Sequence, residues 1–273
     1  MQTYYQKYYR EHFPTEKVMQ LLQLCGLNPV NRDISHSLNN RFNTIENTMQ
    51  LQTLLLSSPT RIDVGAFYLD KHSPKSRQAL AREFFVDVDF SHFCEQCDKA
   101  KKLICKTCWN RFMVPMIVFL QDLFVRELRT EPNDIHFFFS GGKGFHCWIF
   151  RGLLLFFTSR QRSLLANTIN RKLEKFMEEK HLLSLFTTSS SSSSMTNDEL
   201  SDRHQQTDVL DTDVTSSITH TIRMPFSVHD RTGLLCAPLD LTNLNFENCV
   251  FEVNSVDSAT MQMLVERLDH LFL

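Results

Sequence analysis

Two aspartates, Asp87 and Asp89, stand in a strand-forming run of Phe and Val, EFFVDVDF (83–90). Side chains at positions i and i+2 of a strand point to the same face, so this pair crowds negative charge on one side of a sheet. Such like charges repel, and burial raises the cost, unless a cation lies between them. The spacing therefore predicts a cation site at Asp87 and Asp89.

A second segment, VLDTDVT (209–215), repeats the alternation with Asp211 and Asp213 and predicts another strand. One distant aspartate could join the first pair, and Mg²⁺ prefers carboxylate oxygens together with substrate phosphates. Two such ions can clamp the attacking and leaving oxygens of a phosphoryl or nucleotidyl transfer. Three side chains that can carry positive charge follow: His220, Arg223 and His229. The alternative is that Asp213 caps a turn and that His229 is an ordinary core or surface histidine.

A glycine-rich stretch, SGGKGFHCW (140–148), lies between two apolar segments, IHFFF and FHCWIF, and predicts a hairpin or a tight strand–loop–strand connection. Its backbone N–H groups could converge on an anion, with Lys143 adding positive charge and His146 beginning the returning strand. It is not a P-loop, and a solvated hairpin turn explains the pattern equally well.

Four cysteines form two CxxC pairs, Cys94 with Cys97 and Cys105 with Cys108. Two such pairs supply four thiolates for a tetrahedral Zn²⁺, and a closed Cys₄ site is structural rather than catalytic. His92 could replace one thiolate. The alternative, reduced core cysteines, fits poorly because the intervening DKAKKL is polar. The remaining cysteines are expected to be small buried hydrophobes: Cys25, Cys147, Cys236 and Cys249.

Strand and helix patterns mix along the chain, which predicts an α/β (α+β) protein. Two helices are expected in residues 4–25, broken at Phe13-Pro14, and further helices at 109–128, 160–180 and the C-terminal end. Short strands are expected at 32–38 and 61–67, and a strand–turn–strand at 224–241. The serine-rich stretch 187–208 has no apolar periodicity and is predicted to be disordered.

The composition indicates a soluble intracellular protein with no membrane partner. The chain has 273 residues, 42% of them hydrophobic, and 29 basic against 31 acidic side chains, so any polyanion site must be a local patch. The first residues, MQTYYQKYYREHFP, lack the apolar core of a secretory signal. The most apolar stretch, 112–125, is too short for a membrane span and contains Pro115 and Asp122.

Taken in order, these segments resemble the catalytic (small) subunit of archaeo-eukaryotic DNA primase. The resemblance covers residues 4–241 and rests on these stretches: YYQKYYREHFP, RDISHSL, RIDVGAFY, EFFVDVDF, the cysteine cluster ending in Trp109, FSGGKGFHCWIF and LDTDVTSSITHTIRMPFSVHDRTG. It implies a primase–polymerase catalytic core: a mixed β-sheet flanked by helices, within one catalytic domain spanning 1–273. A zinc knuckle at 91–109 and a reduced helical, low-complexity insertion at 158–208 complete the expected domain.

The resemblance also implies an activity and its site residues. The activity is template-directed synthesis of short RNA primers from ribonucleoside triphosphates during DNA replication. Asp87, Asp89 and Asp211 become ligands of two Mg²⁺ or Mn²⁺ ions, with Asp33 as a further catalytic carboxylate. The residues expected to contact the triphosphate are Arg32, Ser140, Gly141, Gly142, Lys143, Gly144, Phe145, His146, His220, Arg223 and His229.

The implied partners are the primase large subunit, a single-stranded DNA template and, in a eukaryote, the DNA polymerase alpha complex. The serine run favours a eukaryotic source and hence the nucleus; in another source the protein would be cytoplasmic. Two alternatives remain: a non-catalytic, zinc-containing nucleic-acid-binding relative, and a repair-type primase–polymerase that prefers deoxynucleotides. Clustered aspartates argue against a pure binder, because negative charge repels a phosphate backbone.

Overall fold

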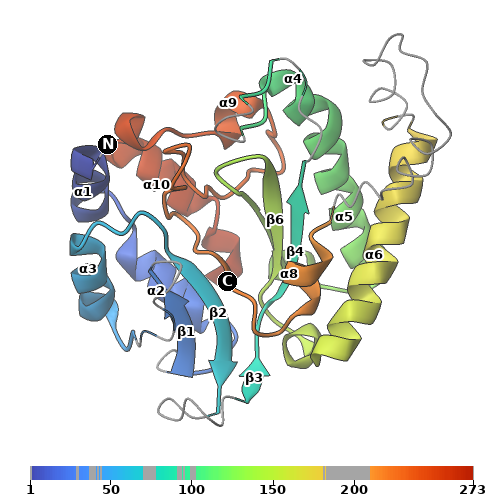
Figure 1. The fold of residues 1–273 in the computed structure, drawn as a ribbon, viewed down its shortest axis with the longest axis horizontal. Coiled ribbons are helices and arrows are strands. Elements are labelled where there is room, and N and C mark those ends of the chain that lie inside the picture. The colour runs from blue at the N-terminus through green and yellow to red at the C-terminus, as the bar shows by residue number, and fades with distance from the viewer. Residues whose placement is uncertain are drawn as a thin grey trace, which may run out of the picture.

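Two antiparallel sheets form the centre of the molecule (Figure 1). The computed structural model describes residues 2–28, 31–36, 41, 43, 45–69, 78–90, 94, 96–98, 103–180, 182 and 210–272. The stretch 187–208, which we expected to be disordered, lies outside the described residues, as does His92. The α/β class is confirmed, although the expected single mixed sheet is two sheets whose described pairings are all antiparallel.

The first sheet has the strand order β1-β2-β3, with β7 also paired to β2. Its strands are β1 (Arg32–Ser35), β2 (Asp63–Tyr68), β3 (Ala79–Ala81) and β7 (Ile222–Arg223). Around it lie α1 (Gln2–Glu11), α2 (Thr15–Gln23), α3 (Thr48–Leu56) and α10 (Ser258–Glu266). The N-terminal pair of helices breaks at Phe13-Pro14 as expected, and Asp257 caps α10 by accepting from the Thr260 N–H. Helix α3 was not predicted.

The second sheet has the order β4-β6-β5 and contains the predicted hairpin. Its strands are β4 (Phe84–Asp89), β5 (Ile135–Phe139) and β6 (Gly144–Ile149). Helices α5 (Val114–Arg126) and α6 (Ser159–Glu179) cover one face of this sheet (Figure 1). Thr158 and Gln161 form a capping box that starts α6, so helix starts here follow local sequence signals.

Shorter elements connect these layers. The helical turns are α4 (Lys106–Cys108), α8 (Thr212–Ser216) and α9 (Phe246–Cys249), with 3₁₀ turns at Pro132–Asp134, Leu153–Phe156, Val253–Ser255 and Asp269–Phe272. Residues 224–241 form isolated bridges, such as Val228 with Leu235, rather than the two strands we expected. Leu234 and Pro238 also bridge to different neighbours, and this divided pairing prevents a regular ladder.

A continuous helical segment runs from Lys106 to Arg126 through a π-helical turn at Trp109–Met113. Pro115 has no backbone N–H and cannot donate the regular helical hydrogen bond to the preceding turn. A π-helical turn just before it accommodates this missing bond. With 21 residues and a mean hydropathy of 1.2, the segment is long and apolar enough to cross a membrane, which the shorter stretch 112–125 was not. Its Met116, Ile117 and Leu120 side chains are buried in the core, the arrangement of a helix that covers a sheet.

Candidate active site

Along β4, apolar core side chains point to one face of the sheet and the two aspartates point to the other. Phe84, Val86 and Val88 join the hydrophobic cluster under α5 and α6. Phe85 packs on the opposite face, so Asp87 and Asp89 share that opposite face with it. The predicted placement of both aspartates on one face of a strand is therefore confirmed, and that face is turned toward the first sheet.

Asp211 reaches the same place from a distant part of the chain. Leu210 bridges Val88, and the Asp211 backbone N–H donates to the Asp87 carbonyl at 2.8 Å. The strand predicted at 209–215 is wrong: after the single bridge the chain turns into α8, whose N-cap is Asp211. Its carboxylate accepts from the Val214 N–H at 2.9 Å, and this local bond competes with strand pairing.

These three aspartates line one pocket of about 350 Å³ together with most of the predicted binding residues. The predicted residues in its wall are Asp87, Asp89, Asp211, Ser140, Lys143, His146, His220, Arg223 and His229. They come from β4, the 140–144 turn, β6, α8 and the 220–229 segment. The fold thus brings together side chains that lie more than 140 positions apart.

The pocket concentrates negative charge at its floor. Burial raises the pKa of Asp87 well above its usual value, and the charges of Asp89 and Asp211 raise it further. Asp87 Oδ1 is buried and accepts no hydrogen bond within the part of the chain that the structure describes. Lys143 Nζ lies 2.8 Å from Asp89 Oδ2 and supplies one compensating charge. An orphaned carboxylate oxygen among three acids fits a hard divalent cation.

The glycine turn is shaped by Ser140 and by close backbone approaches. Ser140 Oγ accepts from the N–H groups of Gly142 at 3.3 Å and Gly144 at 3.2 Å, so these two groups do not point at an external anion as expected. A Cβ on Gly144 would lie 1.8 Å from the Val88 oxygen, and one on Gly141 would lie 2.7 Å from the His229 Cβ. These glycines permit close packing rather than binding.

Two histidines in the pocket are held neutral. Burial, then the charge of Arg223, lowers the pKa of His146 to about 3 and that of His229 to about 4. His146 Nε2 lies 3.6 Å from Asp87 Oδ1. His229 Nδ1 accepts from the Arg231 N–H at 3.3 Å, so its ring hydrogen is on Nε2. Each ring can therefore offer one neutral donor to a ligand.

Other predicted residues lie outside the pocket wall. Arg32 forms a buried, two-pronged ion pair with Glu83, both bonds at 2.6 Å, and does not line the pocket. Asp33 is buried and paired with Arg41. Phe145 packs in the core beneath α5 and α6. Gly141 and Gly142 in the turn, and Gly144 at the start of β6, do not line the pocket.

Sequence reasoning missed several pocket residues: Arg61, Val214, Thr221, Ile222, Asp230 and Arg231. Arg61 stands at the start of RIDVGAF and bonds Asp63 at 2.5 Å, while Asp230 lies 3.5 Å from Arg223. The signal for Arg231 was present, because it directly follows His229-Asp230 in the turn-forming SVHDRTG. Arg61 and Arg231 bring the pocket's lysines and arginines to four, with Lys143 and Arg223.

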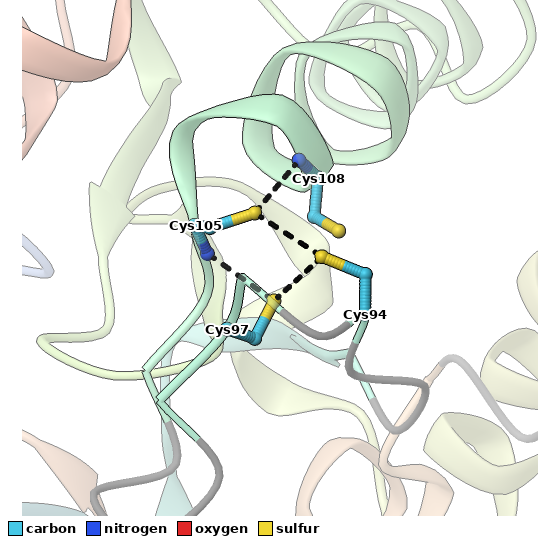
Figure 2. Close-up of side chains that lie close together, drawn as sticks. All are labelled: Cys94, Cys97, Cys105 and Cys108. Atoms are coloured by element: carbon cyan, nitrogen blue, oxygen red, sulfur yellow. Dashed lines mark hydrogen bonds between the residues drawn. The ribbon is translucent and has the colours of Figure 1, made fainter.

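The four predicted zinc ligands converge (Figure 2). The sulfur atoms of Cys94, Cys97, Cys105 and Cys108 all lie within 4.8 Å of one another, with Cys105 capping α4 and Cys108 inside it. Burial and the neighbouring thiols raise the pKa of Cys108, so four thiolates at this spacing need a cation. Soft sulfur donors in this number fit Zn²⁺. Of the other cysteines, Cys147, Cys236 and Cys249 are buried as expected, whereas Cys25 is only half-buried.

The cysteine cluster is tied to the glycine turn by main-chain hydrogen bonds. The Ile104 N–H, beside Cys105, donates to the Gly142 carbonyl at 3.4 Å, and the Phe90 N–H donates to the Lys143 carbonyl at 3.2 Å. These bonds help to hold the backbone of Gly142 and Lys143 in place beside the cysteine cluster.

Replacing Cys105 and Cys108 with serine is expected to remove the bound zinc, because two of the four soft donors are lost. Zinc content of the purified protein, measured by inductively coupled plasma mass spectrometry, should fall from one ion per chain to none. Replacing Cys147 and Cys249 with serine serves as the control, since these cysteines lie outside the cluster. An unchanged zinc content in the Cys105/Cys108 variant would contradict the assignment.

Comparisons with known proteins address the fold and the family of the chain. The structure is similar to the polymerase domain from Mycobacterium tuberculosis ligase D in complex with DNA, with a TM-score of 0.51 over 95% of this chain and 92% of that one, at 12% identity. This likeness shows the primase–polymerase fold. Residues 86–241 match the family model of the DNA primase small subunit, and the chain belongs to that family.

A Caenorhabditis elegans DNA primase small subunit is 29% identical over 131 residues, which are 44% of this chain and 30% of that protein. The match therefore spans less than a third of that relative's length.

Proposed function

We propose that this chain is the catalytic part of a DNA primase, which transfers nucleotides from ribonucleoside triphosphates to make short RNA primers on a single-stranded DNA template. One observation carries the proposal: Asp87, Asp89 and Asp211 meet in a single pocket whose wall also holds three arginines and a lysine. Carboxylates with facing cations suit a metal-bound triphosphate.

The three carboxylates would hold two Mg²⁺ or Mn²⁺ ions, which when bound neutralise the phosphates and polarise the reacting oxygens. Asp87 would contribute its buried Oδ1, which has no hydrogen-bond partner among the described residues. Without a cation, repulsion among the three carboxylates disfavours their ionised state. A bound metal ion would relieve this repulsion, so the pocket favours a substrate that carries metal ions.

The facing side chains would bind and orient the triphosphate. Lys143 can exchange its contact with Asp89 for a phosphate oxygen, and Arg61, Arg223 and Arg231 add fixed positive charge. Ser140 Oγ accepts two backbone hydrogen bonds and keeps its own hydrogen for a ligand. His146 and His229, both neutral, donate without adding charge. These donors would stabilise negative charge that grows on the leaving pyrophosphate.

We place this chemistry in one catalytic domain that includes a zinc knuckle at 91–109 and a short insertion at 158–208. Structural Zn²⁺ at the four cysteines would hold the knuckle against the turn that carries Lys143. The family supports a large subunit as partner. For a eukaryotic source, the proposal places the protein in the nucleus with the DNA polymerase alpha complex.

The test is template-directed incorporation on poly(dT) and poly(dC), with the large subunit present and Mg²⁺ or Mn²⁺ supplied. Labelled ATP should be incorporated only on poly(dT) and GTP only on poly(dC), and Asp87→Ala/Asp89→Ala should abolish both. Asp122→Ala, a change at an exposed helix position paired with Arg126, should leave them unchanged. Equal incorporation by the double variant, or incorporation independent of the template, would sink the proposal; a preference for deoxynucleotides would favour the repair-type polymerase.

A further inference from the structure

Arg82 is a fully buried arginine whose bonds lead to residues 211–220, the catalytic segment, rather than to a carboxylate. It directly follows β3, two positions before β4 begins, it is 0% exposed, and its guanidinium packs 4.5 Å from the centre of the Phe85 ring. Its guanidinium N–H groups donate to the carbonyls of His220 at 2.7 Å, Val214 at 3.0 Å and Thr215 at 3.5 Å. One side chain thus bonds both ends of the stretch between α8 and the pocket's His220.

The stretch held by Arg82 cannot position itself. Helix α8 contains 5 residues, too few to be stable without tertiary contacts. Its remaining bonds to β4 are the Asp211 N–H to the Asp87 carbonyl, at 2.8 Å, and the Asp87 N–H to Thr215 Oγ1, at 3.4 Å. Helix α8 also packs against α6, and the Ile218 N–H donates to Ser159 Oγ at 3.4 Å. Among the hydrogen bonds that tie this stretch to the rest of the fold, Arg82 makes three.

Keeping Arg82 buried is costly, which points to a specific role. Burial, then the charge of Arg162, lowers its pKa well below the usual value, and the nearby Glu83 carboxylate is bonded in two-pronged fashion by Arg32. Arg82 Nε has no hydrogen-bond partner among the described residues. A buried arginine is kept at such cost when the carbonyls it satisfies would otherwise be orphaned.

We propose that Arg82 is a positioning residue that holds Asp211 and His220 against β4 and thereby sets the affinity of the carboxylate site for divalent cations. The inference deepens the proposed function and rests on its carboxylate site. Asp87, Asp89 and Asp211 would contact the ion directly, whereas Arg82 would fix the position of Asp211.

The experiment measures Mn²⁺ binding to the full chain by electron paramagnetic resonance, without nucleotide or template. Arg82→Met should raise the dissociation constant at least about tenfold, because the carbonyls of three residues lose their donor and the third carboxylate moves. Arg82→Lys should recover part of the affinity, since one ammonium can still reach the His220 carbonyl. Thr215→Val, which removes only the acceptor for the Asp87 N–H, should weaken binding without removing the arginine.

Arg267→Met is the matched control. Arg267 is half-buried and, like Arg82, donates to backbone carbonyls, but these belong to Pro238 and Asn248, both at 2.9 Å and both outside residues 211–220. It should lower thermal stability and leave the dissociation constant unchanged. Thermal melts of every variant identify loss of folding, and if Arg82→Met does not fold, Arg82→Lys carries the test.

The outcomes separate the two claims. Wild-type protein that binds no Mn²⁺ overturns the proposed carboxylate site and the role of Arg82 with it. Wild-type protein that binds Mn²⁺, with unaltered affinity in the folded Arg82 and Thr215 variants, overturns the role of Arg82 alone. Equal weakening by Arg267→Met also overturns it, because a general loss of packing would then explain the effect.

Discussion

Asp211→Asn is expected to lower the rate of nucleotide incorporation by roughly a thousandfold, equivalent to about 4 kcal/mol of transition-state stabilisation. Asparagine caps a helix as well as aspartate does, so the side-chain bond to the Val214 N–H and the fold of α8 are kept. What is lost is one of the three carboxylates that, in the proposed function, would hold the metal ions of the triphosphate. The measurement is steady-state incorporation at saturating template and nucleotide.

Asp213→Asn is the matched control, because Asp213 lies two positions further along, is exposed and does not line the pocket. Its rate should stay within about twofold of wild type, as expected for a surface change away from the site. Equal rates in the two variants would mean that Asp211 is only a helix cap and that the pocket lacks a third catalytic carboxylate.

Glu83→Gln is expected to reduce the free energy of unfolding by about 3–5 kcal/mol. Glu83 and Arg32 are 1% and 0% exposed, and two bonds of 2.6 Å join them. The Glu83 charge also raises the pKa values of Arg82 and Arg162, so its removal leaves three buried arginines without their shared counter-charge. Urea denaturation followed by circular dichroism measures the loss.

The control for this variant is Glu127→Gln. Glu127 pairs with Lys172 at 2.8 Å, but both side chains are roughly half exposed, and a pair of this kind contributes about 0–1 kcal/mol. A loss under about 1 kcal/mol in Glu83→Gln as well would contradict the view that a buried carboxylate balances the arginines beneath the catalytic segment.

Local patterns predicted the parts of the site that neighbouring residues determine. Alternation in β4 placed Asp87 and Asp89 on one face because strand geometry imposes a period of two. The stretch around Lys143 turned back as a hairpin because Gly141 takes a φ of 84°, a left-handed conformation that glycine adopts without steric cost. Paired CxxC spacing predicted the cysteine cluster for a similar reason, since a short loop brings its two thiols together.

Long-range partners could not be read from local patterns. Asp211 looked like a strand residue because the pattern of VLDTDVT is compatible with both a strand and a capped turn, and contact with β4 decided between them. Arg32 was expected near the triphosphate, but its partner is Glu83, 51 positions away. Arg82 gave no signal in the sequence, because its hydrogen-bond partners are backbone carbonyls more than 130 positions further along the chain. Every residue has a backbone carbonyl, so no residue type marks these partners.

Anomalous diffraction from crystals soaked with Mn²⁺ and a ribonucleoside triphosphate tests the central claim most directly. We expect two manganese peaks between the triphosphate and the carboxylates of Asp87, Asp89 and Asp211, with the phosphates facing Lys143 and Arg223. Crystals that bind the triphosphate away from these aspartates, or that show no manganese between them, would contradict it.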